Sequence, residues 1–197
     1  MTGIMQSMVG ASFSSGGGEA VPLSLSFYET RLGATIGTIN VYVVDTSGNI
    51  QGSSVYSASG QFLAEGWLLR TAATPDVSGS FRIAWHYVSG TSFTGDYAID
   101  TVTLQGNSYN FDSTSDGFLT TSGVNTSSSV TALANTVSVP TSTGATLGRW
   151  NRDTGTTPSS FTGPSGAQSG TFYLYAETSS PNFSNVNMWL FSPVITV

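Results

Sequence analysis

The residues that could catalyse a reaction are few in this chain, and His86 is the first to consider. It is the only histidine among 197 residues, and the chain has no cysteine. A Cys–His pair or a histidine-rich metal centre is therefore excluded. A Ser–His–Asp triad would need His86, but no Gly-x-Ser-x-Gly turn accompanies it. His86 lies in the middle of a predicted strand, where a lone histidine is more often a surface or packing residue than a base.

Glycoside hydrolysis, which needs two spaced carboxylates, is another reaction that the composition allows. The chain has 11 Asp and Glu residues, but no spaced pair of them stands at strand ends among aromatic residues. We therefore predict that the protein is not an enzyme.

Asp100 is a candidate for binding a cation. In the run 96–104, a period-two alternation places Asp100 on one face with Ala98, Val102 and Leu104. A carboxylate that points to an apolar side needs a partner. A hard cation such as Ca²⁺ is one such partner, and backbone amides or an arginine are the alternatives.

The elements that must position these residues are short strands, because apolar residues alternate with polar ones along much of the chain. We expect strands at residues 23–28, 39–43, 55–56, 67–69, 81–88, 96–104, 109–112, near 118, and at 172–177, 186–191 and 194–197. Residues 120–146 are rich in Ser, Thr and Gly and are expected to form a long surface excursion with one edge strand. No segment has a helical period, so the pattern predicts an all-β fold, a jelly-roll β-sandwich.

The charge of the chain excludes several classes of partner. The formal net charge is -6, and all 5 basic residues are arginines. Nucleic acids and anionic membrane surfaces both require clustered Lys and Arg. No apolar run approaches the roughly 20 residues of a membrane span, and the N-terminus lacks the basic region of a secretory signal. We therefore expect a protein folded in a cytoplasm, with no nucleic-acid partner and no membrane span.

Residues 1–20 have the pattern of an arm that precedes a single domain at 21–197. The glycines at residues 16–18 break any regular element. A sticky segment before a flexible hinge indicates docking on a partner or on further copies of the chain, and a frayed terminus is the alternative. The apolar residues expected to make this contact are Ile4, Met5, Met8, Val9 and Phe13.

The last quarter of the chain carries the most specific pattern. Its fixed points are Trp150 and Arg152, then Thr157-Pro158-Ser159, Thr162-Gly163-Pro164, Tyr173-Leu174-Tyr175 with Glu177, and finally Ser192-Pro193. In this order these residues resemble the signature of the MAM domain, a jelly-roll adhesion module of extracellular proteins. The family's first strand, Cys-Asp-Phe-Glu, corresponds to Tyr109-Asn110-Phe111-Asp112, in which its Cys is lost and its Glu is an Asp.

The second half of the family's pattern is also present, but here it comes first. Residues 23–44 and Trp67 resemble its strands, and residues 95–104 resemble its ending, Gly-Asp-Ile-Ala-Ile-Asp-Asp-Ile. The resemblance therefore covers residues 21–197 in circularly permuted order. In one structure the halves pair within the chain, and Val197 ends near Val21. In the other the halves are exchanged between subunits. The short joint at 105–109 favours the first.

The resemblance also implies roles for individual residues. Trp150, Arg152 and Glu177 are expected to be the framework of the fold, with Arg152 and Glu177 as candidate buried partners. The acid of the family's first strand and the Asp of its Ile-Asp strand fall on Asp112 and Asp100. The resemblance thus implies that these two carboxylates hold a structural Ca²⁺.

From these features we expect a non-enzymatic virion structural protein, a decoration, fibre or tail-appendage subunit of a marine phage, made in the host cytoplasm. The absence of a signal, of Cys and of Lys favours this assignment, as does the arm. Its partners would be other virion proteins or further copies of itself. The alternative is a carbohydrate-binding or host-receptor-binding module that contacts a cell-surface glycan through Tyr28, Tyr42, Tyr56 and His86.

Overall fold

The computed structural model describes residues 13–15, 20–62, 66–122, 133–179 and 184–197. The strands are β1 (Phe13–Ser15), β2 (Val21–Thr30), β3 (Thr38–Asp45), β4 (Tyr56–Ser59), β5 (Leu68–Val88), β6 (Tyr97–Leu104), β7 (Asn107–Tyr109), β8 (Leu119–Thr121), β9 (Thr136–Ser138), β10 (Trp150–Asp153), β11 (Tyr173–Ala176), β12 (Asn187–Phe191) and β13 (Ile195–Thr196). A short 3₁₀ helix, η1 (Leu133–Asn135), precedes β9. No helix in the described residues is long and apolar enough to cross a membrane.

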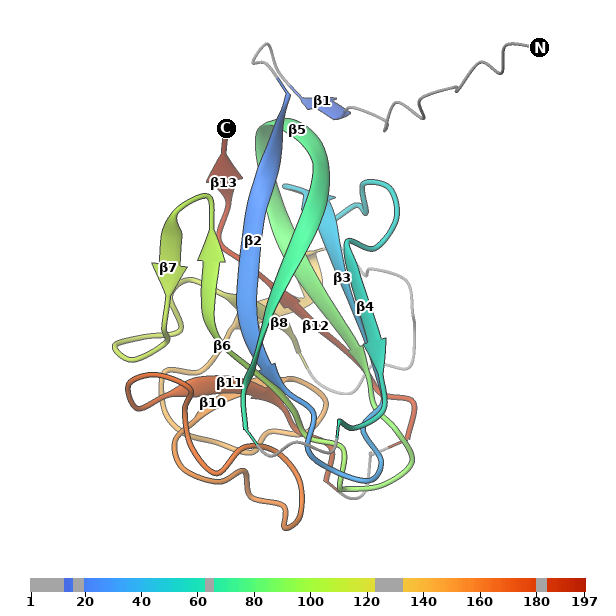
Figure 1. Cartoon of the computed structure of the whole chain (residues 1–197), viewed down its shortest axis with the longest axis vertical. Coiled ribbons are helices and arrows are strands. Elements are labelled where there is room, and N and C mark those ends of the chain that lie inside the picture. Colours follow the sequence, from blue (N-terminus) through green and yellow to red (C-terminus); the bar gives the residue numbers. More distant parts are fainter. Residues whose placement is uncertain (1–12, 16–19, 63–65, 123–132, 180–183) are drawn as a thin grey trace, which may run out of the picture.

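The long strand β5 joins two largely antiparallel sheets into a sandwich (Figure 1). Its first half pairs with β2 and continues the order β10-β11-β6-β2, and its second half lies between β3 and β12 and leads on to β8 and β9. Between the halves the strand turns over at one end of the molecule, where Gly79 has a φ of 77°. We call residues 77–81 the β5 arch. The predicted all-β, jelly-roll-like sandwich is confirmed.

The core fills the space between the sheets with the residues that alternate inward along each strand. Phe27 of β2 packs edge-to-face on Trp85 of β5, with ring centroids 5.8 Å apart. In the strand expected at 81–88, the alternate residues Phe81, Ile83, Trp85 and Tyr87 all belong to this core. Two smaller clusters pack on the outer faces, one around Trp189 and one around Tyr173 and Tyr175.

A bulge in β6 corrects the predicted face of Asp100. The register against β2 shifts between Ser26 and Tyr28, which leaves an extra residue in β6. Thr101 takes a φ of 46° there. Beyond it Val102 and Leu104 point into the main core, whereas Ala98 lies in the outer cluster with the tyrosines. Asp100 therefore does not share a face with Val102 and Leu104.

The strand expected at 109–112 is shorter and lies earlier. It is β7, which ends at Tyr109, and Phe111 has a φ of 61° that a strand does not tolerate.

Within the expected excursion at 120–146, β9 pairs with β8 at the end of the second sheet. That confirms the edge strand predicted there.

The ends of the domain meet at the β5 arch. Val21 pairs with Val77, and the Val197 N–H donates to the Gly79 carbonyl at 3.1 Å. In this structure the two halves pair within one chain, through β11 with β6 and β12 with β5. The joint is a tight turn at Gln105, where β6 folds back on β7.

Of the five apolar residues expected to make the arm's contact, one lies in the described structure. Phe13 begins β1, which pairs in parallel with β5 at Val77. Ile4, Met5, Met8 and Val9 lie outside the described residues.

Candidate functional site

Arg152 of β10 holds together segments that are distant in the sequence. Its Nε donates to the Phe111 carbonyl at 2.6 Å and one Nη to the Asp112 carbonyl at 2.7 Å, and its other Nη donates to the carbonyl of Thr141. The guanidinium carbon lies 3.2 Å from the centre of the Phe172 ring. Arg152 is buried, so the side chain replaces water at carbonyls that would otherwise lack partners.

Glu177 is buried as well, but it is not the partner of Arg152. Its carboxylate accepts the Ser179 N–H at 2.8 Å and the Tyr175 hydroxyl at 3.2 Å. Arg152 lies opposite Leu174 on the core side of the sheet, whereas Glu177 follows Tyr175 on the outer side. The expected pairing is therefore wrong, because the two side chains project from opposite faces. Trp150 lies fully buried in the core, as predicted.

The Thr162-Gly163-Pro164 run anchors a long loop to the start of the domain. The Thr162 hydroxyl accepts the Asp96 N–H at 2.9 Å and donates to the Leu32 carbonyl at 3.0 Å. Gly163 has a φ of 66° and donates its N–H to the same carbonyl at 2.9 Å. A side chain at Gly163 would collide with Thr157. This part of the signature thus fixes the loop in place.

Asp100 and Asp112, the predicted calcium ligands, both contact one short loop. The Asp100 carboxylate accepts the N–H groups of Gln168 at 2.8 Å and Ser169 at 3.2 Å. Asp112 accepts those of Thr171 at 2.7 Å and Phe172 at 3.1 Å. The alternative expected for Asp100, that it binds backbone amides, is confirmed. Burial raises the pKa of Asp100 to about 6, and the amides oppose that shift.

Asp96 is a buried acid that sequence analysis did not single out. One oxygen accepts the Thr178 N–H and hydroxyl, both at 3.0 Å. The other, Oδ2, lies near Thr157 but has no partner with hydrogen-bond geometry in the described residues. Burial, and then the charge of Glu177, raise the pKa of Asp96 to about 7. Asp96 directly precedes β6, and its partners Thr162 and Thr178 come from distant segments, so the local pattern does not reveal its burial.

Glu29 is a second buried acid that was missed, and it faces the core. It forms ion pairs with Arg70 at 2.8 Å and Arg31 at 3.1 Å. Its carboxylate also accepts the hydroxyls of Tyr56 at 2.7 Å and Tyr97 at 2.8 Å. Tyr56 belongs to the second sheet and Glu29 to the first, so this cluster ties the two layers together.

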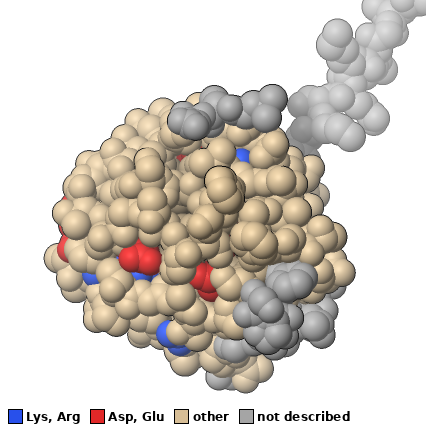
Figure 2. Space-filling model, turned by 90° about the horizontal axis from the view of Figure 1, so that it is seen from below, with Lys and Arg blue, Asp and Glu red and all other residues tan. Residues whose placement is uncertain are grey.

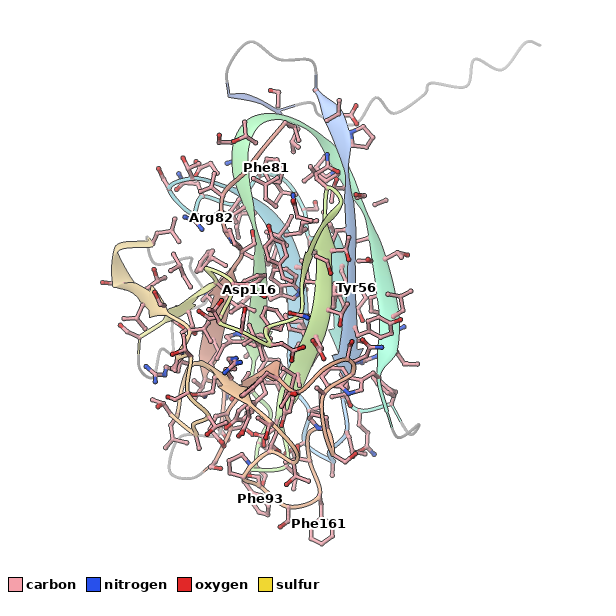
Figure 3. The ribbon with its side chains drawn as sticks, turned by 90° about the vertical axis from the view of Figure 1, so that its left-hand side faces the viewer. Tyr56, Phe81, Arg82, Phe93, Asp116 and Phe161 are labelled. Atoms are coloured by element: carbon pink, nitrogen blue, oxygen red, sulfur yellow. The ribbon has the colours of Figure 1, made fainter. Side chains whose placement is uncertain are left out.

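Exposed aromatic residues gather at the end of the sandwich opposite the β5 arch. Phe161 is 88% exposed and takes a φ of 64°, and Phe93 is 45% exposed. Figure 3 shows both rings at this end and Phe81 toward the other. We call this the loop end. Figure 2 looks onto it and shows a surface made mostly of uncharged residues.

A pocket of about 490 Å³ opens beside Phe161. Residues 156–165 form most of its wall, and Thr30, Leu32, Gly66 and Trp67 complete it. The Trp67 Nε1–H donates to the Gly166 carbonyl at 3.0 Å, and its ring packs edge-to-face on Tyr173 at 5.9 Å. None of the lining residues that the structure describes carries a charge. The volume is within the range of small-molecule sites.

Most of the residues expected to contact a glycan instead pack or form hydrogen bonds within the domain. The His86 ring stacks on Trp189 at 3.9 Å, and its Nε2 lies 2.7 Å from the amide oxygen of Asn187. Burial lowers the pKa of His86, which favours the neutral ring. Tyr42 also packs on Trp189, and the Tyr56 hydroxyl is bound in the core cluster. His86 is thus the packing residue that its strand position predicted.

Phe161 could have been noticed from its sequence context, because it is a large apolar residue inside a run of turn-forming residues.

Within the described residues, no group of three or more His, Cys, Asp or Glu side chains is placed to hold a metal ion. No model of a known protein family matches the chain, and no solved structure matches it significantly.

Proposed function

We propose that this protein is a non-enzymatic adhesion and assembly module of a virion surface, such as a fibre, decoration or tail-appendage subunit. The observation that carries the proposal is the separation of two features. The arm enters at the β5 arch through β1, beside Val77, and the strained, exposed Phe161 lies at the loop end. A subunit anchored at the arch would present the loop end outward.

The state of the acids supports a binding role over a catalytic one. Asp100, Asp112 and Glu177 each accept backbone N–H groups, and these bonds hold loops in place. Such carboxylates are fixed structural acceptors, whereas a general acid or base must be able to reach its substrate.

The exposed ring of Phe161 supports contact with another surface. Holding a non-glycine residue at positive φ costs about 1–3 kcal/mol, and burial of the Phe161 ring in the domain does not offset this cost. Contact with a bound partner would bury the ring and supply the missing free energy. A cell-surface receptor is the partner that an outward-facing module would meet.

The test is to locate the protein in native particles and to delete residues 1–18. We expect purified virions to contain the protein, and virions made with the deleted chain to lack it. The deleted chain should keep the thermal melt of the full chain, because β2 to β13 are intact. Particles that never contain the protein would reject the virion assignment. Incorporation of the deleted chain at the normal copy number would reject anchoring by the arm.

A further inference from the structure

The pocket beside Phe161 is built before any ligand arrives. Thr162 and Gly163 tie its wall to Leu32, and the Thr157 hydroxyl donates across the loop to the Thr162 carbonyl at 3.2 Å. On the other side, Trp67 is fixed by its hydrogen bond to Gly166. A pocket whose walls are already ordered loses little entropy when a ligand binds.

The chemistry of the wall selects for a ligand that is neutral and rich in hydroxyl groups. Trp67 and Phe161 offer aromatic surface, while Thr156, Ser160 and Ser165 offer hydroxyls. An aromatic ring packs on the C–H face of a sugar, and hydroxyls exchange hydrogen bonds with it. A purely apolar ligand would leave those hydroxyls without water or a partner.

The charges around the pocket argue against an anionic ligand. None of the residues that line it is an Arg, and the chain contains no Lys. Arg31 lies between the lining residues Thr30 and Leu32 in the sequence, but its side chain is paired with Glu29 and donates to the carbonyls of Ser59 and Gly60. An anionic sugar would therefore find no arginine at this wall that is free to pair with it.

From this geometry we infer that the pocket binds a neutral oligosaccharide, with Phe161 and Trp67 as the aromatic contacts. The inference rests on the proposed adhesive role of the loop end and names the class of receptor that it meets. The backbone of Phe161 supports the inference, because this residue takes a strained positive φ, is exposed to solvent and lines the pocket. Stability given up at one exposed residue is typical of a functional position.

The experiment is a glycan array probed with the labelled full-length chain, followed by calorimetric titration of the neutral oligosaccharides that bind. Phe161→Gly removes the ring and also relieves the positive φ. We expect this variant to have a higher Tm but an affinity weaker by about tenfold or more. Phe93→Ala is the matched control, because Phe93 is exposed at the same end but does not line the pocket. It should change affinity by less than about twofold.

Three outcomes would overturn the inference. They are binding confined to anionic glycans, binding of apolar peptides instead of sugars, and sugar binding that Phe161→Gly leaves unchanged. Virions that carry Phe161→Gly separate this inference from the proposed function. If they fail to attach to cells while no neutral glycan binds, the adhesive role stands and the sugar assignment falls. If the chain binds neutral glycans through Phe161 but is absent from virions, the sugar assignment stands and the virion role falls.

Discussion

Asp100 and Asp112 hold the two ends of a single loop, since Asp100 accepts the amide of Gln168 and Asp112 accepts that of Thr171. The acids come from opposite sides of the β6–β7 hairpin. Between them the loop passes so close to Asp112 that a side chain at Gly170 would overlap its carboxylate. The pair therefore positions the loop that leads into β11.

Calcium should add little to this arrangement. The amide donors already stabilise both carboxylates, and we expect the same melting temperature in calcium and in EDTA. Differential scanning calorimetry at neutral pH measures it. A rise in Tm with calcium that Asp112→Asn removes would show instead that the resemblance identified a true metal site.

Asp96 should make the protein less stable as the pH rises. Its pKa is about 7 in the folded chain and about 3.9 in an unfolded one, so the folded state retains a proton that the unfolded state releases. The stability that Asp96 contributes to the free energy of unfolding is fully present below about pH 4 and is lost between about pH 4 and 7. Above about pH 7 the free energy of unfolding no longer depends on this group. The loss is about 4 kcal/mol.

The charges around Asp96 support this direction. Glu177 is the acid that raises its pKa, and the surrounding Tyr87, Tyr173 and Tyr175 have raised pKa values and stay neutral. Asp96→Asn should reduce the loss of stability between pH 4 and 7, as measured by urea unfolding at several pH values. An unchanged pH profile in the variant would assign the loss to another group, such as Asp100.

Glu29→Gln should destabilise the fold by about 2–4 kcal/mol. The change leaves Arg70 and Arg31 without an anion in a partly buried cluster. Chemical denaturation gives the difference in unfolding free energy. Asp76→Asn on the exposed part of β5 is the control, with an expected effect within about 0.5 kcal/mol. Equal effects of the two variants would mean that Glu29 does not tie the sheets together.

Arg152→Lys should cost about 2–3 kcal/mol, although the charge is kept. A lysine ammonium cannot reproduce the planar fork that serves the carbonyls of Phe111 and Asp112 together. Arg149→Lys tests the same exchange at a half-buried site that bonds a single hydroxyl, on Thr146. Thermal melts of the two variants should separate clearly. Equal melting temperatures of the two variants would show that the hydrogen bonds of Arg152 do not stabilise the fold more than those of Arg149.

Local patterns predicted most of the strands and much of the core, but they missed residues 70–80 of β5 and the whole of β10. Phe81, Ile83, Trp85 and Tyr87 alternate in sequence and belong to one core cluster, because one face of a strand is set by its own period. The face of Asp100 was mispredicted because a bulge interrupts that period at Thr101. No local residue type signals the bulge there, since a β-branched residue rarely takes a positive φ.

The candidate sites were harder to predict because distant segments build them. Glu29 is bound by side chains from β4, β5 and β6, and no spacing along the chain brings these together. The pocket likewise joins Trp67 to the loop at 156–165. The signature fixed the position of that loop through Thr162 and Gly163, but the exposure of Phe161 depends on the backbone conformation at that one residue.

The β5 arch also determines how the domain would carry mechanical load. A tether at the arm and a receptor at the loop end would pull along the length of β2 and β5, whose ladder runs from Val21 to Glu29. Force along paired strands shears many backbone hydrogen bonds at once, whereas force across them would open the bonds one by one. A module tethered and bound in this way would resist detachment by flow, and the first contact to yield would be the short β1 pairing at Val77.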